Sequence, residues 1–301
     1  MANGFNVTGL EDFTKAGTKI FLKETLFSPR MQRFEMMTNI QHTKLLNFLD
    51  AHPEIQAGIC GVDAKGSTPI IDKKITVEEM SIRDEYCLSD LKDKNFPFEK
   101  GTGKGNMDTQ ARAALVASVA NNVAVDIDAL LWKGKVASGD LFDGWLTEAL
   151  ADSNAIAVTG TALIPSNIIS KLDEICTAYP EVAYKRGLAY IHVSQTVFNS
   201  YKVALRTANL YHNVAGNKVS EMDIFGWEGQ FKLIVERGLI GNKANALCTT
   251  DKNLVVGVDE LGEVTELQLY FNPSTKKLEI SAGWKLGNTY KYANEIVIYK
   301  A

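Results

Sequence analysis

The most regular hydrophobic pattern in the chain lies between residues 106 and 132. Asn106 is a suitable N-cap for a helix there, and apolar residues recur at every fourth position. They are Met107, Ala111, Leu115, Val119, Val123, Ile127 and Leu131. At about 1.5 Å per residue such a helix is roughly 40 Å long. The pattern predicts one long helix with a single buried stripe, and Val119 lies near the middle of that stripe.

Residues 163–258 alternate between helix-like and strand-like patterns, which is typical of an α/β unit. Ile168, Leu172 and Ile175 share one face of a helix that Tyr179-Pro180 ends. Residues 188–193 are apolar on both faces, as in a central strand, and Ser194 can cap the helix that follows. Two further strands are predicted at residues 231–235 and 254–258.

The C-terminal part predicts antiparallel strands. Apolar and polar residues alternate over residues 267–271, turn-forming residues follow, and the alternation returns over residues 278–286. A last strand is predicted at residues 295–299.

The N-terminal part predicts an arm and a projecting hairpin. Residues 55–62 and 70–82 form two extended runs on either side of a small, polar turn at residues 63–69. These runs carry too few apolar residues to bury both faces, so we expect the hairpin to stand out from the body. The segment before it has a weak pattern, with one helix expected within residues 31–49, and is better explained as an arm that folds against something else.

Composition places the chain among ordinary globular proteins, with 301 residues, 46% of them hydrophobic and 23% charged. A net charge of −4 disfavours tight, sequence-specific nucleic-acid binding. The N-terminus lacks the basic and apolar regions of a signal peptide. Residues 153–170 carry no charge but are too polar to span a membrane, so we expect no membrane partner.

Motifs for chemistry are weak. The loop Gly101-x-Gly103-x-Gly105 fits neither the Walker A nor the dinucleotide pattern, and a flexible hinge before the long helix is the favoured interpretation. The four histidines lack ligand spacing, and His192 is better explained as a hydrogen-bonded core residue than as a catalytic base. The cysteines are Cys60, Cys87, Cys176 and Cys248, which are widely spaced and are interpreted as inert packing residues. We therefore expect no enzymatic activity, no cofactor and no metal.

The order of the elements carries more information than any single motif. After the long helix come Gly139-Asp140 and then Phe142-Asp143-Gly144-Trp145, and the later chain has a strand-to-helix step at residues 191–198 and a glycine turn around Gly226. In this order they resemble the major capsid proteins of tailed bacteriophages, the family with the Hong Kong 97-like fold. Glu228 stands where that family commonly has proline. Residues 75–91 are similar to the hairpin exit in capsid proteins of phages that infect Bacteroidetes.

The resemblance implies an α+β fold with four parts. These are an N-terminal arm at residues 1–54, an extended hairpin loop at 55–82, a peripheral domain at 83–150 and 259–301 that contains the long "spine" helix, and an axial domain at 151–258. Six residues are assigned to assembly as a hypothesis: Lys65, Gly66, Ser67, Val119, Trp145 and Gly226. Some relatives cross-link their subunits through a hairpin lysine. Lys65 is the well-placed lysine here, although a solvated tip residue is the favoured interpretation.

The function implied by the resemblance is self-assembly. Hexamers and pentamers of the chain would form the head shell of a virion around double-stranded DNA, held without sequence specificity, after assembly in the host cytoplasm. Because only residues 1–54 precede the hairpin, a separate scaffolding protein is expected rather than a fused one, together with a portal and decoration proteins. Two alternatives stay open: an encapsulin-like compartment, and a soluble α/β enzyme or ligand-binding protein.

Overall fold

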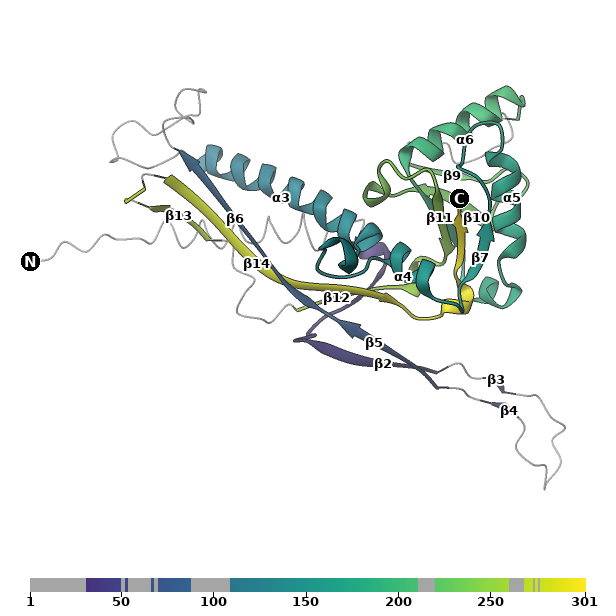
Figure 1. Cartoon of the computed structure of the whole chain (residues 1–301), viewed down its shortest axis with the longest axis horizontal. Helices are drawn as coiled ribbons and strands as arrows, with labels where there is room; N and C mark the ends of the chain where they lie inside the picture. Colours follow the sequence, from purple (N-terminus) through teal and green to yellow (C-terminus); the bar gives the residue numbers. More distant parts are fainter. Residues whose placement is uncertain are drawn as a thin grey trace, which may run out of the picture.

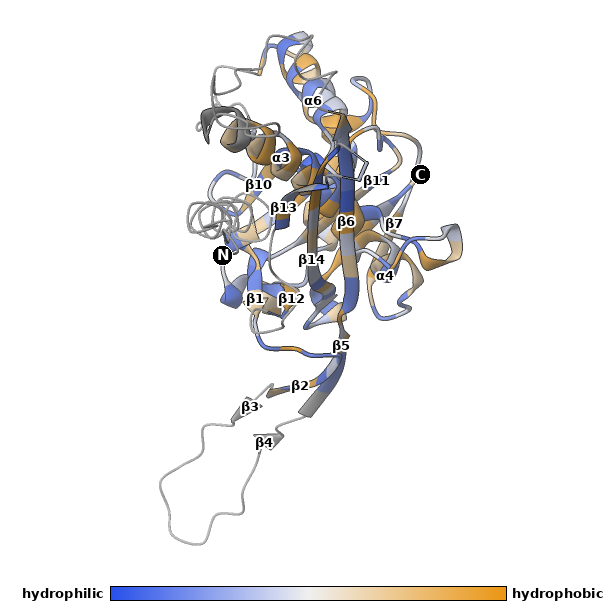
Figure 2. Cartoon of the chain, turned by 90° about the vertical axis from the view of Figure 1, so that its left-hand side faces the viewer, coloured by the Kyte–Doolittle hydropathy of each residue, from blue (hydrophilic) through white to orange (hydrophobic). Residues whose placement is uncertain are grey.

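The computed structural model describes residues 31–49, 52–53, 66–67, 70–87, 109–210, 220–259, 268–272, 274–275 and 277–301. Their helices and strands form a body with two sheets, from which a narrow β-hairpin projects (Figures 1 and 2). The 3-10 turns are η1 (Met31–Arg33), η2 (Val136–Ser138), η3 (Glu181–Arg186), η5 (Arg237–Leu239), η6 (Asp251–Asn253) and η7 (Ala293–Glu295).

The first sheet is built around the 14-residue strand β14 (Lys277–Tyr290). Strand β6 pairs with one edge of β14, and β12 and β13 pair with different parts of the other edge, so every residue of β14 has at least one neighbouring strand. Strand β1 adds to β12 in parallel. The other strands of this sheet are β1 (Glu35–Met37), β6 (Glu78–Cys87), β12 (Leu254–Val258) and β13 (Gln268–Asn272).

The spine helix α3 (Thr109–Lys133) packs against this sheet. The long helix predicted from the sequence is therefore present, but its buried stripe is wider than a four-residue repeat. Val116, Ala120 and Trp132 are buried between the predicted positions, whereas Val119 is only half-buried. A 3.6-residue period explains the difference, because a strict four-residue repeat drifts around the helix.

By length and composition alone, residues 113–133 of this helix could also cross a membrane. In the described structure its inner face instead packs into the larger of two main hydrophobic clusters, as the core helix of a globular protein does.

The second sheet has six strands in the order β7-β15-β11-β8-β10-β9. Its strands are β7 (Ile156–Thr159), β8 (Ala189–Val193), β9 (Glu221–Asp223), β10 (Phe231–Val235), β11 (Asn245–Thr249) and β15 (Val297–Lys300). Helices α5 (Ile168–Ala178) and α6 (Gln195–Thr207) pack beside it, and α4 (Trp145–Ala151) lies between the two sheets (Figure 1). The predicted α5 helix, the strand before Ser194 and the strand at Phe231–Val235 are confirmed.

Two strands belong to a different sheet from the one to which the predicted domain boundaries assign them. Strand β12, inside the predicted axial range 151–258, pairs with β14 in the first sheet. Strand β15, inside the predicted peripheral range 259–301, pairs with β7 and β11 in the second. Periodicity predicts that a strand exists but not which distant strand it pairs with, so the boundaries 151–258 and 259–301 do not match the sheets.

The hairpin consists of β2 (Thr43–Leu49) antiparallel to β5 (Ile70–Thr76), with a short pair, β3 (His52–Pro53) and β4 (Gly66–Ser67), further out. The helix predicted within residues 31–49 is wrong, because this segment forms η1, β1 and β2. Pairing with distant strands overrides a weak local helical pattern. The predicted strand at 55–62 lies outside the described residues.

The second hairpin strand does not run unbroken over residues 70–82 as predicted. It changes partner at Val77, where β5 ends its pairing with β2 and β6 begins its pairing with β14. Figure 1 shows β5 and β6 along one line. The hairpin is therefore joined to the body through the longest ladder of the first sheet.

Candidate assembly surfaces

Two aspartates in the loop after the spine helix accept hydrogen bonds from the backbone of the same loop. Asp140 accepts a hydrogen bond from the backbone N–H of Lys135 at 2.8 Å, and Asp143 accepts one from Val136 at 2.9 Å. Gly144 donates to the carbonyl of Gly134 at 2.8 Å, and a Cβ on Gly144 would lie 2.7 Å from the carbonyl oxygen of Leu130. The Gly-Asp and Asp-Gly motifs thus set the shape of a tight loop at the end of α3.

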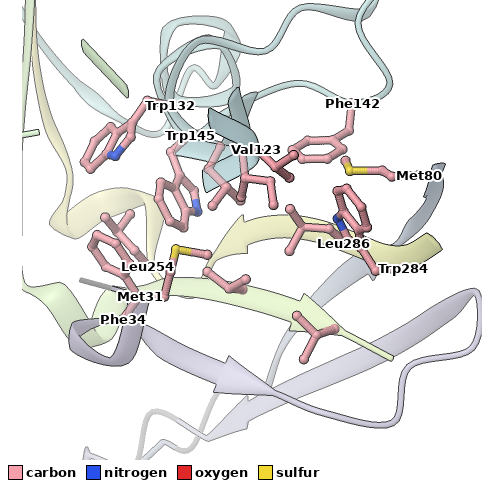
Figure 3. Close-up of a cluster of buried hydrophobic side chains, with 14 of the residues drawn as sticks. Met31, Phe34, Met80, Val123, Trp132, Phe142, Trp145, Leu254, Trp284 and Leu286 are labelled. Atoms are coloured by element: carbon pink, nitrogen blue, oxygen red, sulfur yellow. The ribbon is translucent and has the colours of Figure 1, made fainter. Parts of the chain in front are cut away.

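Trp145, predicted as an assembly residue, is a core residue of the subunit. It is fully buried, and its indole Nε1 donates to the carbonyl of Thr289 at 2.9 Å. Its ring packs 4.8 Å from Phe34 and 5.1 Å from Trp132, measured between centroids (Figure 3). Any effect of Trp145 on assembly must therefore act through the loop and helix that it holds in place.

Gly226 lies in a turn at the edge of the six-stranded sheet. Its φ of 83° is in the left-handed region that favours glycine, and its N–H donates to the Glu228 carboxylate at 3.0 Å. The same turn is tied to both helices beside that sheet. The N–H of Phe225 donates to the Tyr201 hydroxyl of α6 at 2.8 Å, and Trp227 Nε1 donates to Asp173 of α5 at 3.0 Å.

Two of the remaining predicted residues lie in the hairpin. Gly66 and Ser67 pair with Pro53 and His52 in the outer part of the hairpin, away from the body. Lys65 lies outside the described residues. Val119 and Trp145 pack into one hydrophobic cluster, but the hairpin residues and Gly226 lie elsewhere, so the predicted set is not one site.

The root of the hairpin sits on a pair of glycines that sequence reasoning missed. Gly257 and Gly287 are register partners on β12 and β14. A Cβ on Gly257 would come within 2.8 Å of the Ile75 side chain, and one on Gly287 within 2.0 Å of the Thr76 carbonyl oxygen. Glycine inside an otherwise regular strand signals a close approach of this kind, so the signal was present in the sequence.

A small hydrophobic cluster covers this glycine pair. It contains Ile40, Leu46, Ile75, Val77 and Val255. Lys285 adds a hydrogen bond to the Gln41 carbonyl at 3.0 Å. The root is therefore packed, whereas Leu45, Asn47 and Asp72 on the same two strands are exposed.

A charged cluster joins the segment before the hairpin to both sheets. The guanidinium of Arg33 lies 3.1 Å from Glu236 and 2.9 Å from Asp251. Burial disfavours the charged form of Arg33, but the two carboxylates outweigh burial and raise its pKa. His192 is fully buried with its Nδ1 3.1 Å from the same Glu236 oxygen, which confirms it as a hydrogen-bonded core histidine.

Cys176 and Cys248 are buried and offer little nucleophilic chemistry. Burial raises the pKa of the Cys176 thiol to about 12, and burial likewise raises the pKa of Cys248. Thiols in this state are not thiolates near neutral pH. Cys60 lies outside the described residues.

Comparison with known proteins gives matches in structure alone, since no protein-family model and no curated sequence matches the chain. A chain of the procapsid of satellite phage P4, solved with its size determination (Sid) protein, matches with a TM-score of 0.60 and 11% identity, over 100% of this chain and 92% of that one. A chain of the virus-like particle from Pyrococcus furiosus matches with a TM-score of 0.55 and 10% identity, over 97% and 99%.

A third match, from Gordonia phage Cozz, has a TM-score of 0.59 and 13% identity over 89% of this chain and 84% of that one. At such low identities the likeness concerns the fold. These matches define the class: an α+β chain with the fold of phage capsid and related shell proteins. The particular fold is the Hong Kong 97-like one, which confirms the fold expected from the order of motifs.

Proposed function

We propose that this chain is the major capsid protein of a tailed bacteriophage. In this role it self-assembles into hexamers and pentamers that form the head shell around double-stranded DNA. The observation that carries the proposal is the extent of the fold match, which covers between 89% and 100% of the chain in the phage matches described above, with little left over for a different activity. The projecting hairpin supports it, because exposed strands of this kind need a covering surface that a neighbouring subunit supplies.

The finer parts of the proposal follow the resemblance in sequence. The shell belongs to the virion, is assembled in the host cytoplasm, and comes from a phage of Bacteroidetes. A separate scaffolding protein, a portal and decoration proteins complete the head. The chain itself has no catalytic role in this proposal, and the hairpin with Lys65, Gly66 and Ser67 takes part in contacts between subunits.

The test is assembly of the full chain after expression. Sedimentation and electron microscopy should show closed shells, and phage heads formed with their portal should contain DNA protected from nuclease. Replacing residues 50–69 with Asn-Gly would join the paired strand ends Leu49 and Ile70 through a two-residue turn and remove the outer part of the hairpin. This variant should keep near-native thermal unfolding but form few or malformed shells. Normal shells from the shortened chain would show that the hairpin does not act between subunits.

An encapsulin-like compartment is the second candidate. The match to the Pyrococcus virus-like particle favours it, because that match covers 99% of the other chain. Shells that enclose a protein cargo and contain no nuclease-protected DNA would support this candidate. A monodisperse 33.1 kDa species at high concentration would instead favour a soluble enzyme or ligand-binding protein and contradict both shell functions.

A further inference from the structure

One lysine fixes the hairpin strand β5 to the body by charge. The ammonium of Lys73 lies 3.6 Å from a carboxylate oxygen of Asp152, the residue that ends helix α4. It also lies 4.3 Å from the ring centroid of Tyr290 on β14. The Tyr290 hydroxyl donates to the same Asp152 oxygen at 2.7 Å. Lys73 is therefore the point at which hairpin, helix and central strand meet.

A second carboxylate faces this point from one turn earlier on α4. Glu148 is half-buried, and its Oε2 is shut off from solvent. The N–H of Asp152 donates to the Glu148 carbonyl, which places the two acids on one face of the helix. The cluster thus has two acids on α4, Asp143 in the preceding loop, and Lys73 as the cation from the hairpin.

The charge state of Glu148 is sensitive near neutral pH. Burial raises its pKa to about 7, and Asp143 and Asp152 raise it too, whereas Lys73 and the Thr289 hydroxyl act to lower it. Buried carboxylates of this kind change charge in a range where ordinary carboxylates do not.

We propose that Glu148 is a proton-operated switch that sets how firmly Lys73, and with it strand β5, is held against the body. Ionised Glu148 adds its negative charge to that of Asp152 on the same face of α4 and draws Lys73 inward. Protonated Glu148 removes that charge and lets the hairpin root loosen. The switch belongs to the subunit and goes beyond the proposed shell function, on which it does not depend.

The direction follows from linkage between the proton and the lysine. Since Lys73 lowers the pKa of Glu148, loss of the proton must favour the arrangement in which Lys73 is close. The hairpin root is therefore held more firmly above pH 7 and less firmly below it. If the pKa of Glu148 differs by about one between the arrangement with Lys73 close and the one with Lys73 released, losing the proton changes the equilibrium between these arrangements about tenfold.

The test is hydrogen exchange of the full chain between pH 5.5 and 8.5, read by mass spectrometry on peptides that cover β5. Strand β10 of the same molecule serves as the internal reference, which removes the intrinsic pH dependence of exchange. Protection of β5 relative to β10 should rise several-fold with a midpoint near pH 7. A flat profile, or protection that falls with rising pH, would overturn the proposal.

Variants assign the effect to the cluster. Glu148→Gln and Lys73→Met should both keep β5 in the less protected form at every pH and abolish the midpoint. Glu181→Gln, an exposed carboxylate on η3, is the matched control and should retain the wild-type profile. A midpoint that survives in a folded Glu148→Gln variant would show that another group titrates. If that variant does not fold, Lys73→Met and the wild-type profile decide the matter, because persistence of the transition without Lys73 contradicts the proposal.

Discussion

The six-stranded sheet and the projecting hairpin are both built from short strands, but they bury their side chains in opposite ways. Strands β8, β10 and β11 are buried at nearly every position, because α5 and α6 cover one face and part of the larger hydrophobic cluster covers the other. The hairpin buries side chains at its root, while Leu45 on β2 is 61% exposed. The first region closes its core within one chain, and the second leaves an apolar side chain of its short strands in solvent.

This comparison separates residues that fold the subunit from residues that act between subunits. In the two-sheet body, substitutions should change the free energy of unfolding directly. In the hairpin beyond its root, substitutions should leave that free energy nearly unchanged and alter assembly. If folding residues and assembly residues are separate in this way, the largest loss of stability should come from the spine helix in the body.

Ile127→Asp should be the most destabilising change. Ile127 is 2% exposed in the C-terminal half of the spine helix, so the new carboxylate would be buried without a partner, at a cost on the order of 4 kcal/mol or more. Val119→Asp is the matched comparison, because half-buried Val119 lets the carboxylate reach solvent and should cost about 1 to 2 kcal/mol. Thermal unfolding of both variants measures the difference, and equal losses would mean that the stripe on α3 is wrongly placed.

Gly287→Val should separate the root of the hairpin from the body. A Cβ at this position would lie 2.0 Å from the Thr76 carbonyl oxygen, and backbone atoms cannot move aside as a flexible side chain can. We expect a loss of about 1 to 3 kcal/mol, with exchange protection lost mainly in β5 and β6 rather than in β8 and β10.

The control for this change is Ala157→Val at an exposed position of β7, where the added methyl groups meet solvent. Uniform loss of protection over both sheets in Gly287→Val would contradict the view that the root is a local contact.

Ser194→Ala should have the smallest effect, confined to the six-stranded region. The Ser194 hydroxyl accepts from the N–H of Val197 at the start of α6 and donates to the Asn242 carbonyl at 2.5 Å. Loss of an N-cap costs about 1 kcal/mol. Chemical denaturation should show this loss, and the neighbouring exposed Gln195→Ala should show almost none. Shell yield should be the same for both, since neither residue lies in the hairpin.

The same contrast explains what the sequence could predict. Helix α5, strand β8 and the Ser194 cap follow from local periodicity and capping chemistry, so they were predicted correctly. The segment around β1 and β2 was wrongly predicted as a helix. Its apolar residues are spaced to contact distant parts of the chain, and that spacing does not follow the period of a strand. Phe34, for example, packs against Trp132 and Trp145, about a hundred residues later in the sequence.

The candidate sites divide in a similar way. The Gly-Asp loop, the turn at Gly226 and the core role of His192 were found by motif and pattern, since each depends on neighbours in the sequence or on burial in a strand. The glycine pair and the cluster of Lys73 with Glu148 were missed. Lys73 of β5 comes to lie 3.6 Å from Asp152, one turn after Glu148, only in the folded chain, and no spacing in the sequence indicates that contact.

The continuity of β5 and β6 has a mechanical consequence. A pull on the hairpin passes through Val77 into β6, which is paired with β14 along all ten of its residues. Because β5 and β6 lie along one line, such a tension acts parallel to the strands and perpendicular to their hydrogen bonds (Figure 1). The hydrogen bonds between β6 and β14 are then loaded together in shear, instead of breaking one after another. The subunit can therefore be pulled from its hairpin with the force borne by its longest strand, while the six-stranded sheet lies off the line of tension.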